Sequence, residues 1–235
     1  MLNSPFTLKT PKQKVYICVL AGTERTLWIN PDLALWLTVL VKSDNYDVTF
    51  NYTKDAKPWH VAANRAIQYA RDAHADWLMM VENDQSYMLN PLDVLDHVTD
   101  QKIITLPSLV LFDNVPCSCI QGAVYEDRGD FIRVQAGSCG TLFLHHTVWE
   151  TMPGPWFKLQ MKPGAESGEL LTSHDCGFFQ EVQEQGFAVW THREHWLKHY
   201  HTAELAALAL TTGKPLPTMY DRVKAGTNFK YVDTL

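Results

Sequence analysis

The chain has 235 residues, a hydrophobic content of 46% and a formal net charge of −6. This length suits one large α/β domain, and the apolar content is ample for a sizeable core. The acidic balance argues against binding of nucleic acid by bulk electrostatics, but it does not exclude nucleic acid as a substrate.

Neither terminal nor internal segments indicate a membrane protein. The first fourteen residues contain no apolar region of a secretory signal, and the apolar stretch at 33–41 is too short to span a bilayer. Five cysteines, an odd number, do not indicate a disulfide framework. We therefore expect a cytoplasmic protein with reduced thiols and no stable membrane association.

The first half of the chain alternates strand and helix patterns. A β-branched apolar run at 15–20 predicts a buried strand, and Asn30-Pro31-Asp32 supplies a cap, a proline and an acid for the start of a helix. Further strands are expected at 47–52, 77–81 and 103–106, with helices at 59–74 and 90–98. This β-α-β-α-β-α-β order predicts a doubly wound sheet of parallel strands.

Beyond Pro107 the pattern becomes less regular. Short strands are expected at 119–123, 131–134, 141–145, 187–190 and 196–200, with a Pro/Gly-rich loop at 152–168. Ser173 is expected to cap a helix that stops at Gly186. We treat 1–210 as one domain, with a nucleotide-binding half near 14–106, an acceptor half near 107–201 and a C-terminal tail at 211–235.

Two carboxylates, Glu82 and Asp84, follow the third predicted strand directly. Ligands of doubly wound sheets bind outside the carboxyl ends of the strands. Carboxylate oxygens can hold Mg²⁺ or Mn²⁺ there and leave positions for water and diphosphate oxygens. The commoner meaning of such a triplet is a solvated turn, and its place after a strong strand favours the metal site.

Several short motifs occur in one order along the chain. They are Ala62-Ala63-Asn64-Arg65 through to Asp84, Gly137-Ser138-Cys139-Gly140 with Trp149-Glu150 and Pro155-Trp156-Phe157, His174-Asp175 leading to Gly186, and Lys198-His199-Tyr200. This order resembles that of family-2-like GT-A glycosyltransferases, including short phage and bacterial members. The resemblance covers 14–201 and implies the GT-A fold, a Rossmann-like mixed sheet that is mostly parallel in its N-terminal half, with helices on both faces.

The resemblance also implies roles for individual residues. It implies Asp84, Glu82 and His199 as metal ligands, Asn64, Arg65, Gly22 and Asn83 on the donor side, Gly140, Trp156 and His174 on the acceptor side, and Asp175 as general base. Two positions depart from the family pattern. Glu82 stands where the family has an aspartate, and His174 replaces the acid before Asp175.

Each candidate also has an ordinary structural interpretation. Asp175 can simply cap a helix, Arg65 can be a surface arginine, and paired glycines can permit a bend. Most tryptophans are expected in the core, with Trp156 favoured as a platform for a sugar or base. The histidines and cysteines form no finger or zincin spacing, but a structural zinc site stays an alternative.

The activity implied by the resemblance is metal-dependent transfer of a sugar from a nucleoside diphosphate, preferably UDP, to a hydroxyl, with inversion and with Mn²⁺ or Mg²⁺. A glycan, a protein or a hydroxymethylpyrimidine of phage DNA are the acceptors left open. One alternative is a sugar-phosphate nucleotidyltransferase, suggested by the loop at 20–26, which lacks that family's further glycines and lysine. The other is a non-catalytic module that binds nucleotide sugars.

Overall fold

The computed structural model describes residues 11–20, 29–53, 58–112, 115–118, 120, 125–161, 170–172 and 174–199. The helices of this part are α1 Pro31–Leu40, α2 Trp59–Asp72, α3 Asp93–Asp96, α4 His146–Thr151 and α5 His174–Glu184. Its strands are β1 Gln13–Leu20, β2 Tyr46–Tyr52, β3 Trp77–Glu82, β4 Gln85–Tyr87, β5 Ile103–Thr105, β6 Leu109–Phe112, β7 Val115–Ser118, β8 Glu126–Arg128, β9 Phe131–Val134, β10 Thr141–His145, β11 Gln160–Met161, β12 Leu170–Thr172, β13 Val189–His192 and β14 Leu197–His199.

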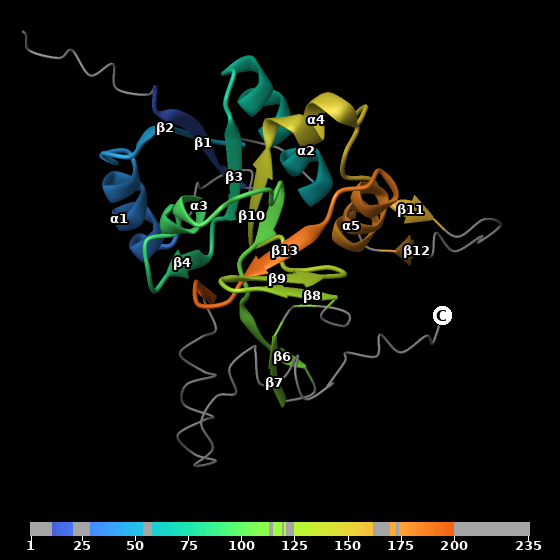
Figure 1. The fold of residues 1–235 in the computed structure, drawn as a ribbon. Helices are drawn as coiled ribbons and strands as arrows, with labels where there is room; N and C mark the ends of the chain where they lie inside the picture. The colour runs from blue at the N-terminus through green and yellow to red at the C-terminus, as the bar shows by residue number, and fades with distance from the viewer. Residues whose placement is uncertain are drawn as a thin grey trace, which may run out of the picture.

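One large sheet organises the molecule (Figure 1), with the strand order β2-β1-β3-β10-β5-β13-β9-β8. β1 runs parallel to β2 and β3, and β5 runs parallel to β13. β10 lies antiparallel between β3 and β5, so the four strands predicted in the N-terminal half run in one direction but are not all neighbours. The residues Thr141 to Leu144 of β10 are fully buried, which suits a central position in the sheet.

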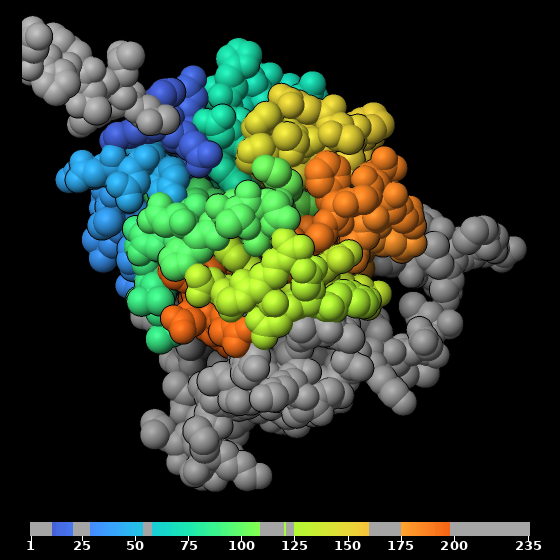
Figure 2. All heavy atoms as spheres, in the orientation of Figure 1, coloured from blue at the N-terminus to red at the C-terminus, as the bar shows by residue number. Residues whose placement is uncertain are grey.

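Helices cover both faces of this sheet. Val15, Ile17 and Val19 of β1 pack with α1 and α3, whereas the residues that alternate with them pack with α2, α4 and α5. In Figure 2 the yellow atoms of α4 adjoin the orange atoms of α5, and both helices belong to the layer that also contains α2. The expected mixed α/β fold, parallel in its N-terminal half and covered on both faces, is confirmed.

The helix ends follow the predicted chemistry at α1 and α5. Asn30 Oδ1 accepts a hydrogen bond from Asp32 N at 2.9 Å, and Pro31 takes the first helical position. α5 stops before Gly186, whose φ of +86° is the left-handed conformation that glycine adopts without strain. These two signals are confirmed.

Other expectations are corrected. The helix expected at 90–98 is reduced to Asp93–Asp96, because Asn90 Oδ1 accepts from Leu92 N and Val98 N bonds to Leu95 O, so that turns replace both ends. Most of the strand expected at 119–123 lies outside the described residues, as do Ser173 and the tail at 211–235. No helix of the described part has the length and apolar character needed to cross a bilayer.

Candidate functional site

Backbone hydrogen bonds anchor the loop that follows β3 on two sides. Glu82 N donates to the Gly140 carbonyl at 2.9 Å, which ties the end of β3 to the start of β10. Asn30 N donates to the Asn83 carbonyl at 2.8 Å, which ties the loop to the start of α1. The loop is thus fixed at the carboxyl end of a central strand, the edge where ligands of such sheets bind.

A single buried amide draws the two predicted metal ligands together. Gln85 Nε2 lies 3.5 Å from Glu82 Oε2 and 3.4 Å from Asp84 Oδ1, both long hydrogen bonds. Trp59 Nε1 donates a much shorter bond, 2.8 Å, to Glu82 Oε1. The two carboxylates therefore share one side-chain donor, and Glu82 is held by a second.

The oxygen chemistry of this loop fits a hard divalent cation. Gln85 is 1% exposed, and its Oε1 has no hydrogen-bond partner among the described residues. Gln85 Nε2 faces the two carboxylates, whose oxygens match the ligand preference of Mg²⁺ and Mn²⁺. Among the side chains that the structure describes, no group of three His, Cys, Asp or Glu residues is arranged around one point as metal ligands.

The predicted third ligand, His199, approaches this loop through its backbone. β14 pairs antiparallel with β4, and His199 is the partner of Gln85 in that register. Paired strands lie about 5 Å apart. Two segments far apart in the sequence are thereby brought side by side, while the His199 side chain lies outside the described part.

Two glycines permit close packing around the loop. A Cβ on Gly140 would come within 3.1 Å of Gln85 Nε2, and a Cβ on Gly137 would come within 2.1 Å of Thr105 Oγ1. Gly140, predicted on the acceptor side, thus lies against the amide that bridges the carboxylates. A side chain at Gly137 would clash with Thr105, whereas at Gly140 it would only press on the ends of the Gln85 and Ser138 side chains.

Asn64 is engaged with the loop at 156–157. Its Oδ1 accepts from Trp156 N at 2.8 Å and Phe157 N at 3.0 Å, while its Nδ2 donates to His60 O and Phe157 O. These four bonds use the full capacity of the amide. Asn64 could contact a nucleotide-sugar substrate only if one of these four hydrogen bonds broke. Arg65, the next residue of α2, is partly buried.

The structure gives Trp156 a core position. Its ring is 5% exposed, its Nε1 donates to Met152 O at 2.9 Å, and Arg71 lies over the ring at 5.7 Å. A buried ring has no free face for a sugar or base, so the expected platform role is not supported by this arrangement. Gly22 and the side chain of His174 lie outside the described part.

Asp175 lies in the first turn of α5, where its Oδ1 accepts a hydrogen bond from Cys176 N at 2.9 Å. A line of aromatic contacts joins this helix to the metal loop. Phe178 stacks on Phe157 at 4.2 Å, and Phe157 meets the Trp59 ring edge-on at 5.2 Å. Because Trp59 bonds to Glu82, side chains in direct contact connect α5 with the predicted metal ligand.

A buried histidine pair shapes the corner between β13 and β14. His192 Nδ1 accepts from Glu194 N at 3.2 Å and His195 N at 3.3 Å, and it lies 3.1 Å from His195 Nδ1. Burial and the neighbouring His195 lower the pKa of His192 to about 4, and burial lowers the pKa of His195 also. The corner that leads to His199 is therefore built on neutral imidazoles.

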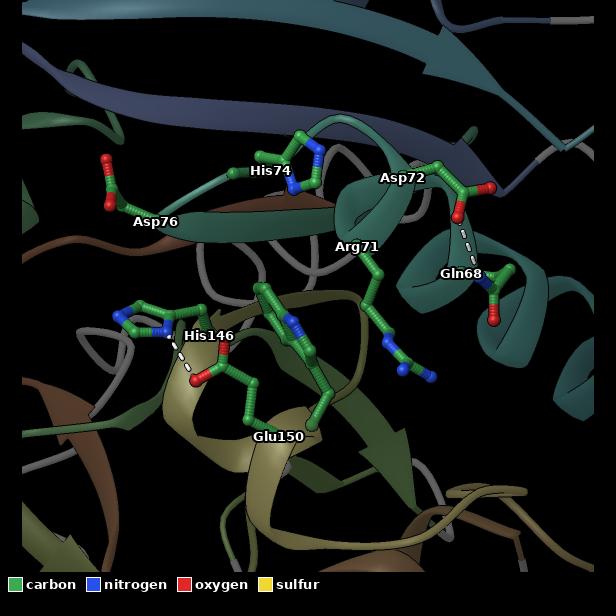
Figure 3. Close-up of a pocket in the computed structure, with 9 residues that line it drawn as sticks. Gln68, Arg71, Asp72, His74, Asp76, His146 and Glu150 are labelled. Carbon is green, nitrogen blue, oxygen red and sulfur yellow. Dashed lines mark hydrogen bonds and ion pairs between the residues drawn. The ribbon is translucent and has the colours of Figure 1, made fainter.

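A separate pocket of about 660 Å³ lies between the end of α2 and α4 (Figure 3). Polar side chains of its wall pair locally: His146 Nδ1 lies 2.9 Å from Glu150 Oε2, and Gln68 Nε2 donates to Asp72 Oδ1 at 2.8 Å. None of the predicted metal-binding, donor-side, acceptor-side or general-base residues lines it, although Trp149 and Glu150 of one motif do.

Sequence reasoning missed two residues of the site, Trp59 and Gln85. Gln85 adjoins the acidic triplet, so its position along the chain was a usable signal. Trp59 is 23 residues from Glu82, and nothing in the local pattern at the start of α2 indicates their contact.

Comparisons with known proteins establish the fold and nothing finer. No protein-family model and no curated protein sequence matches the chain. The structure is similar to that of A197 from STIV, with a TM-score of 0.56 and 10% identity over 80% of this chain and 85% of that one.

Two enzyme structures are similar at lower TM-scores. A Drosophila β1,4-galactosyltransferase 7 variant, crystallised with manganese, UDP-Gal and xylobiose, gives a TM-score of 0.46 and 12% identity over 83% of this chain and 73% of that one. A UTP-bound UGPase from Acinetobacter baumannii gives 0.45 and 8% identity over 94% and 100%. At these TM-scores the likeness carries no argument about activity.

Proposed function

We propose that the chain is a metal-dependent glycosyltransferase of the GT-A type that uses a nucleoside-diphosphate sugar, with UDP as the preferred nucleotide. The observation that carries the proposal is the pair Glu82 and Asp84, fixed beside the buried Gln85 at the carboxyl end of β3. The resemblance of the motif order to family-2-like GT-A enzymes, the mixed α/β fold and the position of His199 opposite Gln85 support it.

In this proposal Asp84 and Glu82 hold Mn²⁺ or Mg²⁺, with His199 as a third ligand. A cation bound there supplies charge neutralisation for the leaving diphosphate. Arg65 is assigned to the same diphosphate, because a guanidinium can donate two parallel hydrogen bonds to phosphate oxygens. Asn83 and Gly22 complete the donor side, and Asn64 acts by holding the loop at 156–157.

Asp175 is assigned as the general base. It accepts the proton of the acceptor hydroxyl as that oxygen attacks the anomeric carbon, and the bond from this carbon to the diphosphate oxygen breaks in line, which inverts the centre. Gly140 and His174 are placed on the acceptor side. The acceptor is a hydroxyl of a glycan, of a protein or of a phage hydroxymethylpyrimidine, and the protein is proposed to act in the cytoplasm, the host's if phage-encoded.

The decisive experiment measures UDP binding with Mn²⁺ by calorimetry. Asp84→Asn keeps the side-chain shape but removes a charged ligand, so we expect metal-dependent UDP affinity to fall by at least about 10-fold, with little loss of stability. Asp44→Asn, an exposed acid away from the loop, is the matched control and should bind as the parent does.

Absence of Mn²⁺-dependent nucleotide binding by the parent chain would overturn the proposal. Release of pyrophosphate from UTP and a sugar phosphate, without transfer from UDP-sugar, would favour a nucleotidyltransferase instead. Binding of UDP-sugar without transfer or hydrolysis would favour a non-catalytic module.

A further inference from the structure

We infer that Trp59 is a positioning residue of the metal site, because its indole N–H fixes the Glu82 carboxylate. The inference rests on the proposed function, since it concerns the same cation. It assigns to Trp59 no contact with donor, acceptor or cation. Its effect passes entirely through Glu82.

Glu82 needs such a partner more than an aspartate would. A glutamate has one more rotatable bond than an aspartate, and restricting that bond opposes binding through side-chain entropy. The hydrogen bond from Trp59 Nε1 to Glu82 Oε1 is 2.8 Å long, whereas the one from Gln85 Nε2 to Glu82 Oε2 is 3.5 Å long. The indole therefore restrains Glu82 more strongly than the Gln85 amide does.

The indole ring of Trp59 is itself held in place by packing against the core. Trp59 meets Phe157 edge-on at 5.2 Å, with an interplanar angle of 81°. Phe157 is 1% exposed, and both its backbone N and its carbonyl bond to the Asn64 amide, at 3.0 Å and 2.7 Å. The orientation of the indole is thus set by packing and hydrogen bonds that require no bound cation, which is what preorganisation requires.

The chemistry of the indole is also suited to a cation site. An indole has one N–H and no acceptor, so it can orient a carboxylate without competing for it as a ligand. It carries no positive charge, whereas a lysine or arginine at the same place would repel the incoming cation. A bond to an ionised carboxylate is stronger than a neutral one, so this single contact can hold Glu82.

The test is a double-mutant cycle on Mn²⁺ affinity, measured with UDP present by the electron paramagnetic resonance signal of free Mn²⁺. Trp59→Phe removes the N–H and keeps an aromatic ring against Phe157. Because changes in residues that orient metal ligands cost on the order of 10- to 100-fold in affinity, we expect a loss in that range. In a Glu82→Ala background the same change should have no further effect.

Controls separate this role from a general structural one. Trp36→Phe also removes a half-buried indole N–H, which bonds to Tyr87 O at 3.2 Å, and it should leave Mn²⁺ affinity unchanged. Trp59→Tyr, whose ring carries an uncharged hydroxyl donor, should bind Mn²⁺ more tightly than Trp59→Phe, and it is the second variant if Trp59→Phe does not fold. Thermal unfolding without metal verifies the folded state of each variant.

The outcomes distinguish two failures. Parental Mn²⁺ affinity in folded Trp59→Phe, or an equal loss in the Glu82→Ala background, overturns the role of Trp59 and leaves the proposed function standing. If the unmodified chain binds no Mn²⁺ with UDP, the proposed function fails, and the role of Trp59 fails with it.

Discussion

Asp175 differs from the carboxylates of the metal loop in how it is held. Its Oδ1 accepts a hydrogen bond from the backbone amide of the next residue, Cys176, in the first turn of α5. The same geometry serves a helix cap and a general base, so only replacement separates the two interpretations.

Asp175→Asn retains a side-chain oxygen that can accept the Cys176 amide, so a structural role alone should survive with near-normal transfer. A general base should not survive, because the amide does not accept the proton. We expect single-turnover transfer to fall by roughly 10²–10⁴-fold with nearly unchanged UDP affinity. Transfer near the parental rate would show that Asp175 caps the helix and is not the general base.

At this scale the sequence predicts residues whose local position defines them. Glu82 and Asp84 are predicted because they follow a strong strand, and the side-chain contacts to Gln85 support their grouping. Trp59 could not be predicted, because its contact depends on how α2 lies against β3. The burial of Trp156 could not be predicted either, because its Pro/Gly setting indicates a loop and does not show whether the ring is exposed.

At the scale of elements, the side chain of Asn64 makes hydrogen bonds that join α2 to the loop at 156–157. Three of the four hydrogen bonds of Asn64 join residues that are 92 or 93 positions apart in the sequence. They fix the backbone of Phe157, against which Trp59 and Phe178 pack. This amide therefore holds together the parts of the candidate site.

We expect Asn64→Ala to lower the free energy of unfolding by about 2–4 kcal/mol, because two backbone amides and two carbonyls lose their partner. Gln68→Ala, on the exposed face of the same helix, removes only a bond to Asp72 and should change stability by less than about 0.5 kcal/mol. Urea unfolding of both variants measures the difference. Equal, small effects would show that the loop does not depend on Asn64.

Elements with strong local signals were predictable, and elements formed by pairing were not. α1 is specified by its cap and proline, and β3 by its apolar run. β4 consists of Gln-Ser-Tyr, a sequence without strand character, and it forms because β14 pairs with it. The insertion of β10 between β3 and β5 depends on contacts distant in sequence, which no periodicity encodes.

At the scale of the whole molecule, buried neutral histidines make stability depend on pH. The pKa of His192 and that of His145 are each lowered from 6.5 to about 4, mainly by burial. In the unfolded chain both groups return to ordinary values. Between these limits the unfolded state binds more protons than the folded state, so stability is complete above pH 6.5 and is lost as the pH falls toward 4.

One pKa unit corresponds to about 1.4 kcal/mol, so His192 alone contributes up to about 3 kcal/mol over this window. Denaturant unfolding at pH 7 and pH 5 should show a marked loss at the lower pH. His192→Asn keeps an acceptor for the amides of the corner but does not titrate, and it should flatten the dependence. An unchanged slope in this variant would remove His192 as its source.

The placement of β5 has a consequence for how the chain acquires its structure. β5 is bordered by β10 and β13, and both of these strands come later in the sequence. During synthesis, Ile103 to Thr105 must wait for nearly ninety further residues before both neighbours exist, whereas β1, β2 and β3 can pair at once. Long-range strand pairing of this kind is slow, and unpaired strand edges invite association with other chains. The completed sheet is therefore a late event shared by both halves of the sequence, and a cut after residue 106 would divide one cooperative unit.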